Sequence, residues 1–225
     1  MERPTRLRFL AAPLALAALA GSVAGCGSSS SSSSSAGTTA ATGAAAQTAT
    51  IAATKASCGS SSASAGTSEA ASTATGDIPD NQQFLTFRNG SGGYSISYPE
   101  GWARSGKSDT VTFQDKSNTI TINVAQGSKP TTASVAAELK QEASSDPCLS
   151  AGTPQATIAG PNQVIKVTYT TEGQKSSVTG QRPKITVDRY VYFKGGKVAT
   201  VDLATPVGVD NVDAYRMISE SFRWS

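Results

Sequence analysis

A run of eight serines, Ser28 to Ser35, opens a tract that extends to about Gly76 and consists almost entirely of Ser, Ala, Thr and Gly. The tract carries almost no charge, and Ile51 is its only large apolar residue. A segment of this composition cannot bury enough apolar surface to offset the conformational entropy that folding costs. We therefore predict a disordered linker over residues 26–79 and a single folded domain over residues 80–225.

The folded segment has about 145 residues, which is the size of one ordinary domain and enough for a sizeable core. Counting along the sequence gives fifteen Lys or Arg residues in this segment against thirteen Asp or Glu residues. A nucleic-acid-binding domain normally has a larger and more clustered positive charge. We therefore expect no nucleic-acid partner.

The first 26 residues have the order of a secretory signal. Three arginines within the first eight residues precede the apolar stretch 9–19, and small residues then lead to Cys26. The sequence Val23–Cys26 resembles the lipobox of bacterial lipoproteins. This resemblance implies that residues 1–25 are removed, that Cys26 is lipidated, and that the protein is anchored at the outer face of the cytoplasmic membrane or in the cell envelope. A membrane-anchor helix and a soluble secreted product are the alternatives. The apolar stretch is shorter than the roughly 20 residues that a spanning helix needs and contains Pro13.

Hydrophobic periodicity predicts more strands than helices in the domain. Alternating patterns predict strands at 84–87, 94–98, 111–113, 119–124, 165–169, 185–193 and 198–203. A four-residue apolar spacing predicts one helix over 131–143, with Val135, Leu139 and Ala143 inward. A second helix is expected over 211–221, with Val212, Tyr215, Met217 and Ile218 inward. These patterns indicate an α+β domain with a twisted, mostly antiparallel sheet and helices packed on it.

Several short motifs in this domain resemble those of the PsbP family. They are Gly93–Trp102 (GYSISYPEGW), the strand pattern Val111–Asp115 and the closing Ser221–Arg223. The resemblance implies the α/β/α sandwich of the PsbP and Mog1-like superfamily, whose members mostly bind other proteins. PsbP itself is an extrinsic subunit of photosystem II linked to calcium and manganese retention. This chain differs from the plant proteins because it has the lipobox, the long linker and no histidine.

The stretch Gly101–Ser108 (GWARSGKS) fits the G-x-x-x-x-G-K-[ST] pattern of phosphate-binding loops. A working phosphate loop follows a buried parallel strand and opens a helix whose N–H groups point at the phosphates. The residues after Lys107 instead have a strand pattern, and Gly106-Lys107 is interpreted as a turn. We therefore expect no nucleotide binding.

The residue types present limit the kinds of catalysis that the chain could carry out. The chain has no histidine, which excludes Ser-His-Asp and Cys-His catalysis and His-ligated zinc. We expect a non-catalytic binding or assembly module without a cofactor. An envelope enzyme with a carboxylate-based site is the alternative. No calcium-loop motif occurs, so a Ca²⁺ site would need scattered carboxylates, with Asp109 and Asp115 as the candidates.

The polar loop Thr171–Pro183 is the candidate partner-binding segment, because long polar loops on rigid sheets often contact partners. Its candidate side chains are Glu172, Gln174, Lys175, Gln181 and Arg182. The expected partners are a protein of unspecified identity and the membrane, which the lipid anchor reaches. Cys58 and Cys148 remain after lipidation, and an oxidising compartment allows them to pair, although both can also stay free.

Overall fold

The computed structural model describes Cys58, residues 76–175 and residues 180–225, all of which belong to one compact unit. The expected signal peptide 1–25, the lipidation site Cys26 and most of the linker 26–79 lie outside the described residues. Packing begins slightly before the expected domain boundary at residue 80. Ile78 is buried, and its N–H donates to the Asn211 Oδ1 atom at 2.8 Å.

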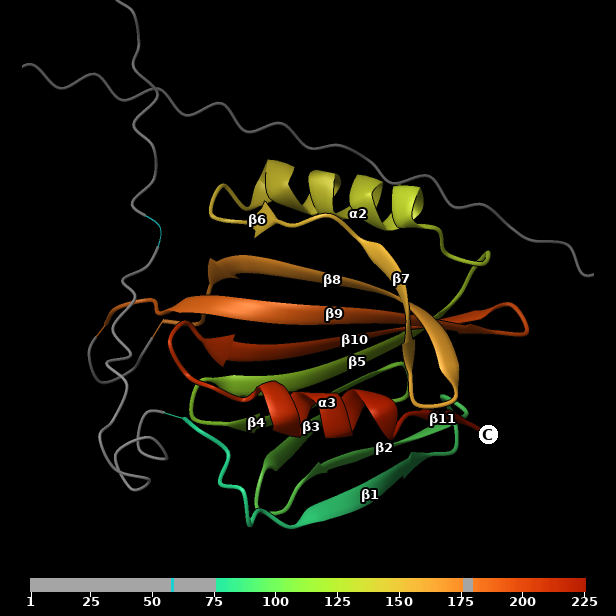
Figure 1. Ribbon diagram of the computed structural model, residues 1–225, viewed down its shortest axis with the longest axis horizontal. Coiled ribbons are helices and arrows are strands. Elements are labelled where there is room, and N and C mark those ends of the chain that lie inside the picture. Colours follow the sequence, from blue (N-terminus) through green and yellow to red (C-terminus); the bar gives the residue numbers. More distant parts are fainter. Residues whose placement is uncertain (1–57, 59–75, 176–179) are drawn as a thin grey trace, which may run out of the picture. The chain divides into compact units, whose positions relative to one another are not determined.

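Within the described residues, eight antiparallel strands form the main sheet, in the order β3-β4-β5-β10-β9-β8-β6, with β7 also paired to β8 (Figure 1). Their bounds are β3 (Ala103–Lys107), β4 (Thr110–Asp115), β5 (Asn118–Gln126), β6 (Ser150–Ala151), β7 (Gln155–Ala159), β8 (Asn162–Glu172), β9 (Lys184–Lys194) and β10 (Lys197–Pro206).

The remaining elements of the described part cover the two faces of this sheet. Helix α2 (Thr132–Ser145) packs on one face. The other face carries helix α3 (Val212–Glu220) and a small sheet of β1 (Phe84–Asn89), β2 (Tyr94–Pro99) and β11 (Arg223–Trp224) (Figure 1). The α+β class with a mostly antiparallel sheet is therefore confirmed, and the domain has three layers.

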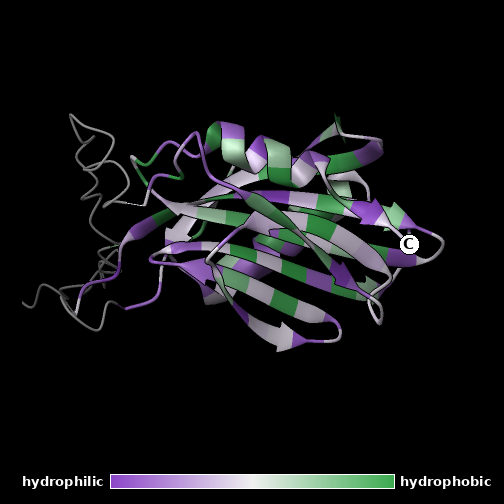
Figure 2. Ribbon diagram, turned by 90° about the horizontal axis from the view of Figure 1, so that it is seen from below, coloured by the Kyte–Doolittle hydropathy of each residue, from purple (hydrophilic) through white to green (hydrophobic). Residues whose placement is uncertain are grey.

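The larger core lies between the main sheet and the layer of α3 and β2. The hydropathy colouring is banded along the strands (Figure 2), as expected where successive residues point to opposite faces of a sheet. Tyr190 and Tyr192 of β9 belong to the core on the α3 side. Phe222 lies at the centre of this core. Its ring stacks on Tyr192 with centroids 4.2 Å apart and on Tyr94 at 5.5 Å.

The smaller core lies under α2. The helix begins at a capping box in which Thr131 and Ser134 bond each other's backbone N–H groups. Val135 and Leu139 are its buried residues and pack on apolar side chains of β8 and β9, whereas Ala143 is only half-buried. Helix α2 thus rests on the sheet through two apolar side chains rather than the expected three.

The prediction for α3 is partly wrong. Tyr215 and Ile218 are buried as expected, but Val212 is 72% exposed and Met217 is 46% exposed. Two residues along a helix correspond to a rotation of about 200°. Val212 precedes the buried Ala214 by two residues and Met217 follows Tyr215 by two, so both point away from the core.

Candidate functional site

A groove of about 940 Å³ lies on the α2 side of the main sheet. Helix α2 packs over β8 and β9, and the strands beyond them, β10, β5 and β4, have no helix on this face. The groove lies over these strands and reaches the polar loop that follows β8. It exists because one helix of 14 residues covers only part of an eight-stranded face.

Uncharged hydrogen-bonding side chains dominate the lining of the groove. Thr112 of β4 and Thr121 of β5 are opposite each other in register, and their hydroxyl oxygens lie 3.3 Å apart. The other lining residues with hydroxyl or amide side chains are Gln114, Ser117, Thr119, Tyr169, Thr171, Gln174 and Gln181. These groups both donate and accept hydrogen bonds, so the groove suits a polar ligand.

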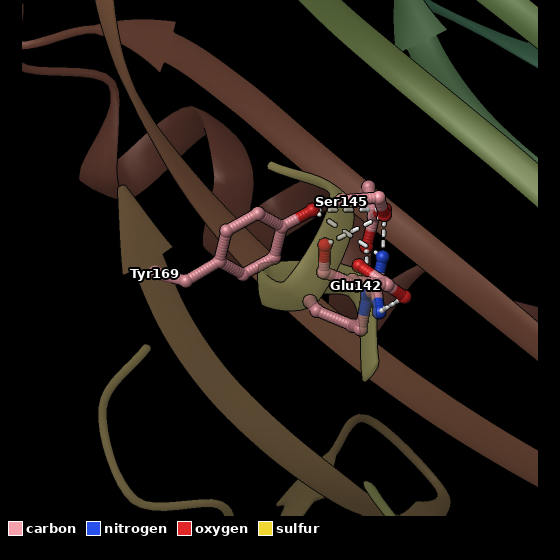
Figure 3. A network of polar contacts seen from close by, with 5 residues as sticks. Glu142, Ser145 and Tyr169 are labelled. Atoms are coloured by element: carbon pink, nitrogen blue, oxygen red, sulfur yellow. Dashed lines mark hydrogen bonds and ion pairs between the residues drawn. The ribbon is translucent and has the colours of Figure 1, made fainter. Parts of the chain in front are cut away.

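One wall of the groove is supported by an ion cluster between α2 and the sheet (Figure 3). Arg189 of β9 is 7% exposed and is the cation of this cluster. Its Nε donates to Asp202 Oδ1 at 2.8 Å, and one terminal nitrogen donates to Glu142 Oε1 of α2 at 2.7 Å. Its other terminal nitrogen donates to Asp202 Oδ2 at 2.9 Å. The cluster therefore fastens α2 to the sheet beside the groove.

The protonation equilibria of the cluster follow from this geometry. Burial alone would lower the pKa of the Arg189 guanidinium, but the hydrogen bond to Asp202, the charge of Asp202 and the contact with Glu142 together raise it. Burial also raises the pKa of the Tyr169 phenol, and the negative charge of Asp202 raises it further. Arg189 thus stays charged and Tyr169 stays neutral over the physiological range.

The structure brings most of the expected partner-binding residues to this groove. Glu172, Gln174, Lys175 and Gln181 line it. Arg182 is outside the lining, and its guanidinium donates to the Gly173 carbonyl at 3.2 Å. The loop is shorter than expected because β8 continues to Glu172, and the Gly173 N–H donates to the Pro183 carbonyl at 2.8 Å across its base.

The two candidate metal-binding carboxylates, Asp109 and Asp115, do not lie close together. Asp109 lies in the turn between β3 and β4, and Asp115 is the last residue of β4. Six residues of extended chain separate them by about 20 Å, so they cannot share one ion. No group of three or more potential metal ligands occurs within Cys58, residues 76–175 and residues 180–225.

The residues that fit the phosphate-loop pattern, Gly101–Ser108, lie in a β-hairpin and not between a strand and a helix. Trp102 is buried in the core, Ala103–Lys107 form strand β3, and the next element is strand β4 rather than a helix. The turn lies at Ser108-Asp109 and not at Gly106-Lys107 as predicted. Gly106 has φ +77°, and a Cβ atom there would lie 2.3 Å from the Thr110 carbonyl oxygen. The β3–β4 hairpin therefore requires a glycine at position 106. The absence of nucleotide binding stays a prediction.

Cys58 and Cys148 form a disulfide in the structure, with Cα atoms 5.3 Å apart. Cys148 follows α2 and directly precedes Leu149 and β6, and Asp146 next to it accepts a hydrogen bond from the Thr171 hydroxyl. The bridge therefore attaches the N-terminal tract to the domain near the start of the polar loop.

We predict that non-reducing peptide mapping of the protein purified from its native compartment yields one peptide that links Cys58 to Cys148. An oxidising compartment maintains such a bond because glutathione and thioredoxin systems do not reduce it there. Recovery of two alkylatable thiols, without prior reduction, would contradict the pairing.

Comparisons with known proteins give structural similarity only. No family model and no curated protein matches the sequence. The solution structure of cyanobacterial PsbP (CyanoP) from Synechocystis sp. PCC 6803 is similar at 16% identity, with a TM-score of 0.47, and covers 67% of this chain and 98% of its own. LpqN of Mycobacterium tuberculosis, described as involved in cell envelope biogenesis, is similar at 16% identity and TM-score 0.37, covering 64% of this chain and 91% of its own. A Bacteroides thetaiotaomicron protein is similar at 12% identity and TM-score 0.42, covering 62% of this chain and 48% of its own. Because each TM-score is below 0.5, none of these proteins assigns a function to this chain.

Proposed function

We propose that the protein is a lipid-anchored, extracytoplasmic binding module that holds a protein partner in the groove beside α2 and does no catalysis itself. The observation that carries this proposal is the groove of about 940 Å³ on the sheet face that α2 leaves open. Binding sites are usually preformed concave surfaces with a few placed polar groups. Four of the five loop side chains expected from the sequence to contact a partner border this groove.

The chemistry of the lining favours a polypeptide segment as the occupant. Hydroxyl and amide side chains such as Thr112, Gln114 and Thr121 satisfy both the N–H and the C=O groups of an extended backbone. The side chains of Ile185 and Val187 add apolar surface to the same groove. A groove of this mixed character resembles a protein-binding surface more than a charged catalytic cleft.

The two carboxylates of the ion cluster support binding rather than catalysis, and Asp202 is the one of them that lines the groove, where Glu172 of the polar loop is the other acidic side chain. A carboxylate-based hydrolase needs two acidic side chains that face the substrate, one of them protonated. Asp202 makes two hydrogen bonds to the buried guanidinium of Arg189, and Glu142 pairs with the same guanidinium. Both carboxylates are therefore engaged in fastening α2 to the sheet.

The extracytoplasmic location in this proposal is supported by the Val23–Cys26 motif and by the Cys58–Cys148 disulfide, which an oxidising compartment maintains. No helix in the described part of the chain has the length and apolar character to cross a membrane. Anchoring through a lipid on Cys26 is thus part of the proposal.

We predict that Cys26→Ala prevents lipidation, so that the protein no longer fractionates with membranes. The matched variant Cys148→Ala keeps the lipid site and should remain in the membrane fraction. Membrane fractionation followed by mass spectrometry of the N-terminal peptide measures both. A Cys26→Ala protein that stays in the membrane fraction with residues 1–25 still attached would contradict the lipid anchor.

The binding function is tested by site-specific photo-crosslinking in intact cells. A photoreactive residue replaces Gln114 in the groove or, as a control, exposed Thr86 on the small sheet. We expect one discrete adduct from position 114 and none from position 86. The absence of any adduct from position 114, or equal adducts from both positions, would contradict a partner in the groove.

A further inference from the structure

The turns of four β-hairpins gather at one end of the main sheet, which we call the hairpin end. They join β1 to β2, β3 to β4, β7 to β8 and β9 to β10, and the C-terminus lies there as well (Figure 1, right). Contacts between turns confirm this. Asn89 donates to the Ser108 carbonyl at 2.8 Å, and the Gly127 N–H donates to the Gly196 carbonyl at 2.9 Å.

Charge divides unevenly between this end and the opposite one. Within the described residues, the cations of the hairpin end are Arg88, Lys107, Lys129, Lys194, Lys197 and Arg223, and its acidic side chains are Asp109 and Glu220. The opposite end has the cations Lys116, Lys175, Arg182 and Lys184 and the acidic residues Asp77, Asp80, Glu100, Asp115, Asp146, Glu172, Asp210 and Asp213. The domain therefore has a basic hairpin end and an acidic opposite end.

The hairpin end also has an apolar feature. A second cavity, of about 380 Å³, lies there between the segment before α2 and strands β7, β8 and β9. Ile158 lines it and is 73% exposed, and Lys129 lies on the same cavity. The exposed Ile158 and Lys129 on the same cavity are the two kinds of side chain that bind a bilayer surface, one by apolar insertion and the other by attraction to anionic headgroups.

We propose that the hairpin end docks on the surface of an anionic lipid bilayer. This inference rests on the proposed lipid anchor, which keeps the domain close to that bilayer and so raises its effective concentration. Lysines on turns act as flexible point charges that suit a diffuse anionic surface. The acidic opposite end is repelled by the same surface, so the charge distribution sets the orientation of the domain.

The chain between the proposed lipid anchor and the disulfide is long enough to permit this orientation. Cys148 precedes β6, which pairs with the last residues of β8, so the disulfide joins the N-terminal tract to the acidic end. The hairpin end is one length of β9 away, 11 residues or about 36 Å. If the linker behaves as its composition predicts, the residues from Cys26 to Cys58 would span about 30 Å root-mean-square as a coil and about 100 Å when fully extended.

Docking by the hairpin end leaves the groove open to a partner. Lys116, Ser117 and the residues of the polar loop border the groove at the acidic end. With the hairpin end on the bilayer, this border faces away from the lipid. The orientation thus gives the proposed binding site its access.

The test uses the lipidated protein purified from membranes and reconstituted in vesicles of phosphatidylcholine alone or with an equal share of phosphatidylglycerol. An amine-reactive reagent labels surface lysines, and mass spectrometry reads each site. We expect labelling of Lys129 to be at least about fivefold slower on the anionic vesicles, with high salt removing the difference. Exposed Lys140 on α2 and Lys184 at the acidic end should label equally on both vesicles.

A variant pair controls for net charge. Lys107→Ala with Lys194→Ala removes two cations from the hairpin end and should lower the ratio of docked to free domains about 25-fold. Lys140→Ala with Lys184→Ala removes the same charge elsewhere and should leave the protection of Lys129 unchanged. Equal labelling of Lys129 on both vesicles, or equal effects of the two double variants, would overturn the proposal.

If the protein has no lipid anchor, the experiment gives a result that differs from a failure of docking. A protein that incorporates into neither vesicle contradicts lipidation, and the same labelling is then read on the protein mixed with the vesicles. Protection of Lys129 in that mixture still supports docking, and unchanged labelling overturns it.

Discussion

Phe222→Ala is expected to lower the free energy of unfolding by about 3–5 kcal/mol, which is a large part of the stability of a typical domain. Phe222 is fully buried at the centre of the larger core. Its ring stacks on Tyr192 and Tyr94 and meets Trp224 edge-on with centroids 5.1 Å apart. Removal of the ring leaves a cavity that three large aromatic side chains cannot fill by small movements. Urea denaturation followed by tyrosine and tryptophan fluorescence measures the change.

Phe222→Leu provides the matched comparison for this site. Leucine keeps most of the apolar volume and loses the ring contacts, so its cost should be clearly smaller than that of alanine. Equal denaturation midpoints for the wild type and Phe222→Ala would contradict the assigned core.

The second large effect is expected at the ion cluster. Arg189→Met should destabilise the protein by about 2–4 kcal/mol, because it leaves Asp202 and Glu142 next to α2 without their cation. This expected destabilisation is smaller than that for breaking a fully buried ion pair, because both carboxylates are partly exposed. The end of α2 should loosen, so amide hydrogen exchange should accelerate in α2 more than in β4 and β5.

Exposed Arg88 supplies the control for the loss of an arginine. Arg88→Met should change the free energy of unfolding by less than about 0.5 kcal/mol. The double variant Arg189→Met with Asp202→Leu should recover part of the loss, since it removes an unpaired carboxylate. Equal stabilities of the Arg189→Met and Arg88→Met proteins would contradict the role of the cluster.

The sequence predicted those elements whose local pattern matches their environment. Strands β2 and β5 alternate apolar and polar residues because one of their faces packs on a core, whereas β9 contains the apolar run Tyr190–Phe193 because both of its faces pack on a core. Strand β3 was missed because all five of its residues are exposed and it is held by backbone pairing to β4 alone. The two-residue strands β6 and β11 likewise have no pattern to detect.

The candidate site was predictable only in part. The loop residues were identified by their polarity, but the groove depends on how much of the sheet α2 covers, which no local pattern specifies. The ion cluster was missed although the sequence contains a signal for it. Arg189 occupies an inward position in the alternating series Ile185, Val187, Arg189 and Val191, and a buried arginine requires a partner.

The most direct measurement of the central claim is the yield of the photo-crosslinked adduct from position 114 in a protein that also carries Thr121→Arg. Thr121 is half-buried in the groove lining, so an arginine there fills part of the space that a partner would occupy. Thr121→Ser keeps the hydroxyl and serves as the matched control, and thermal unfolding verifies that both variants are folded. We predict that Thr121→Arg reduces the adduct to the background of position 86 while Thr121→Ser leaves it near the wild-type yield. An undiminished adduct from a folded Thr121→Arg protein would contradict the groove as the binding site.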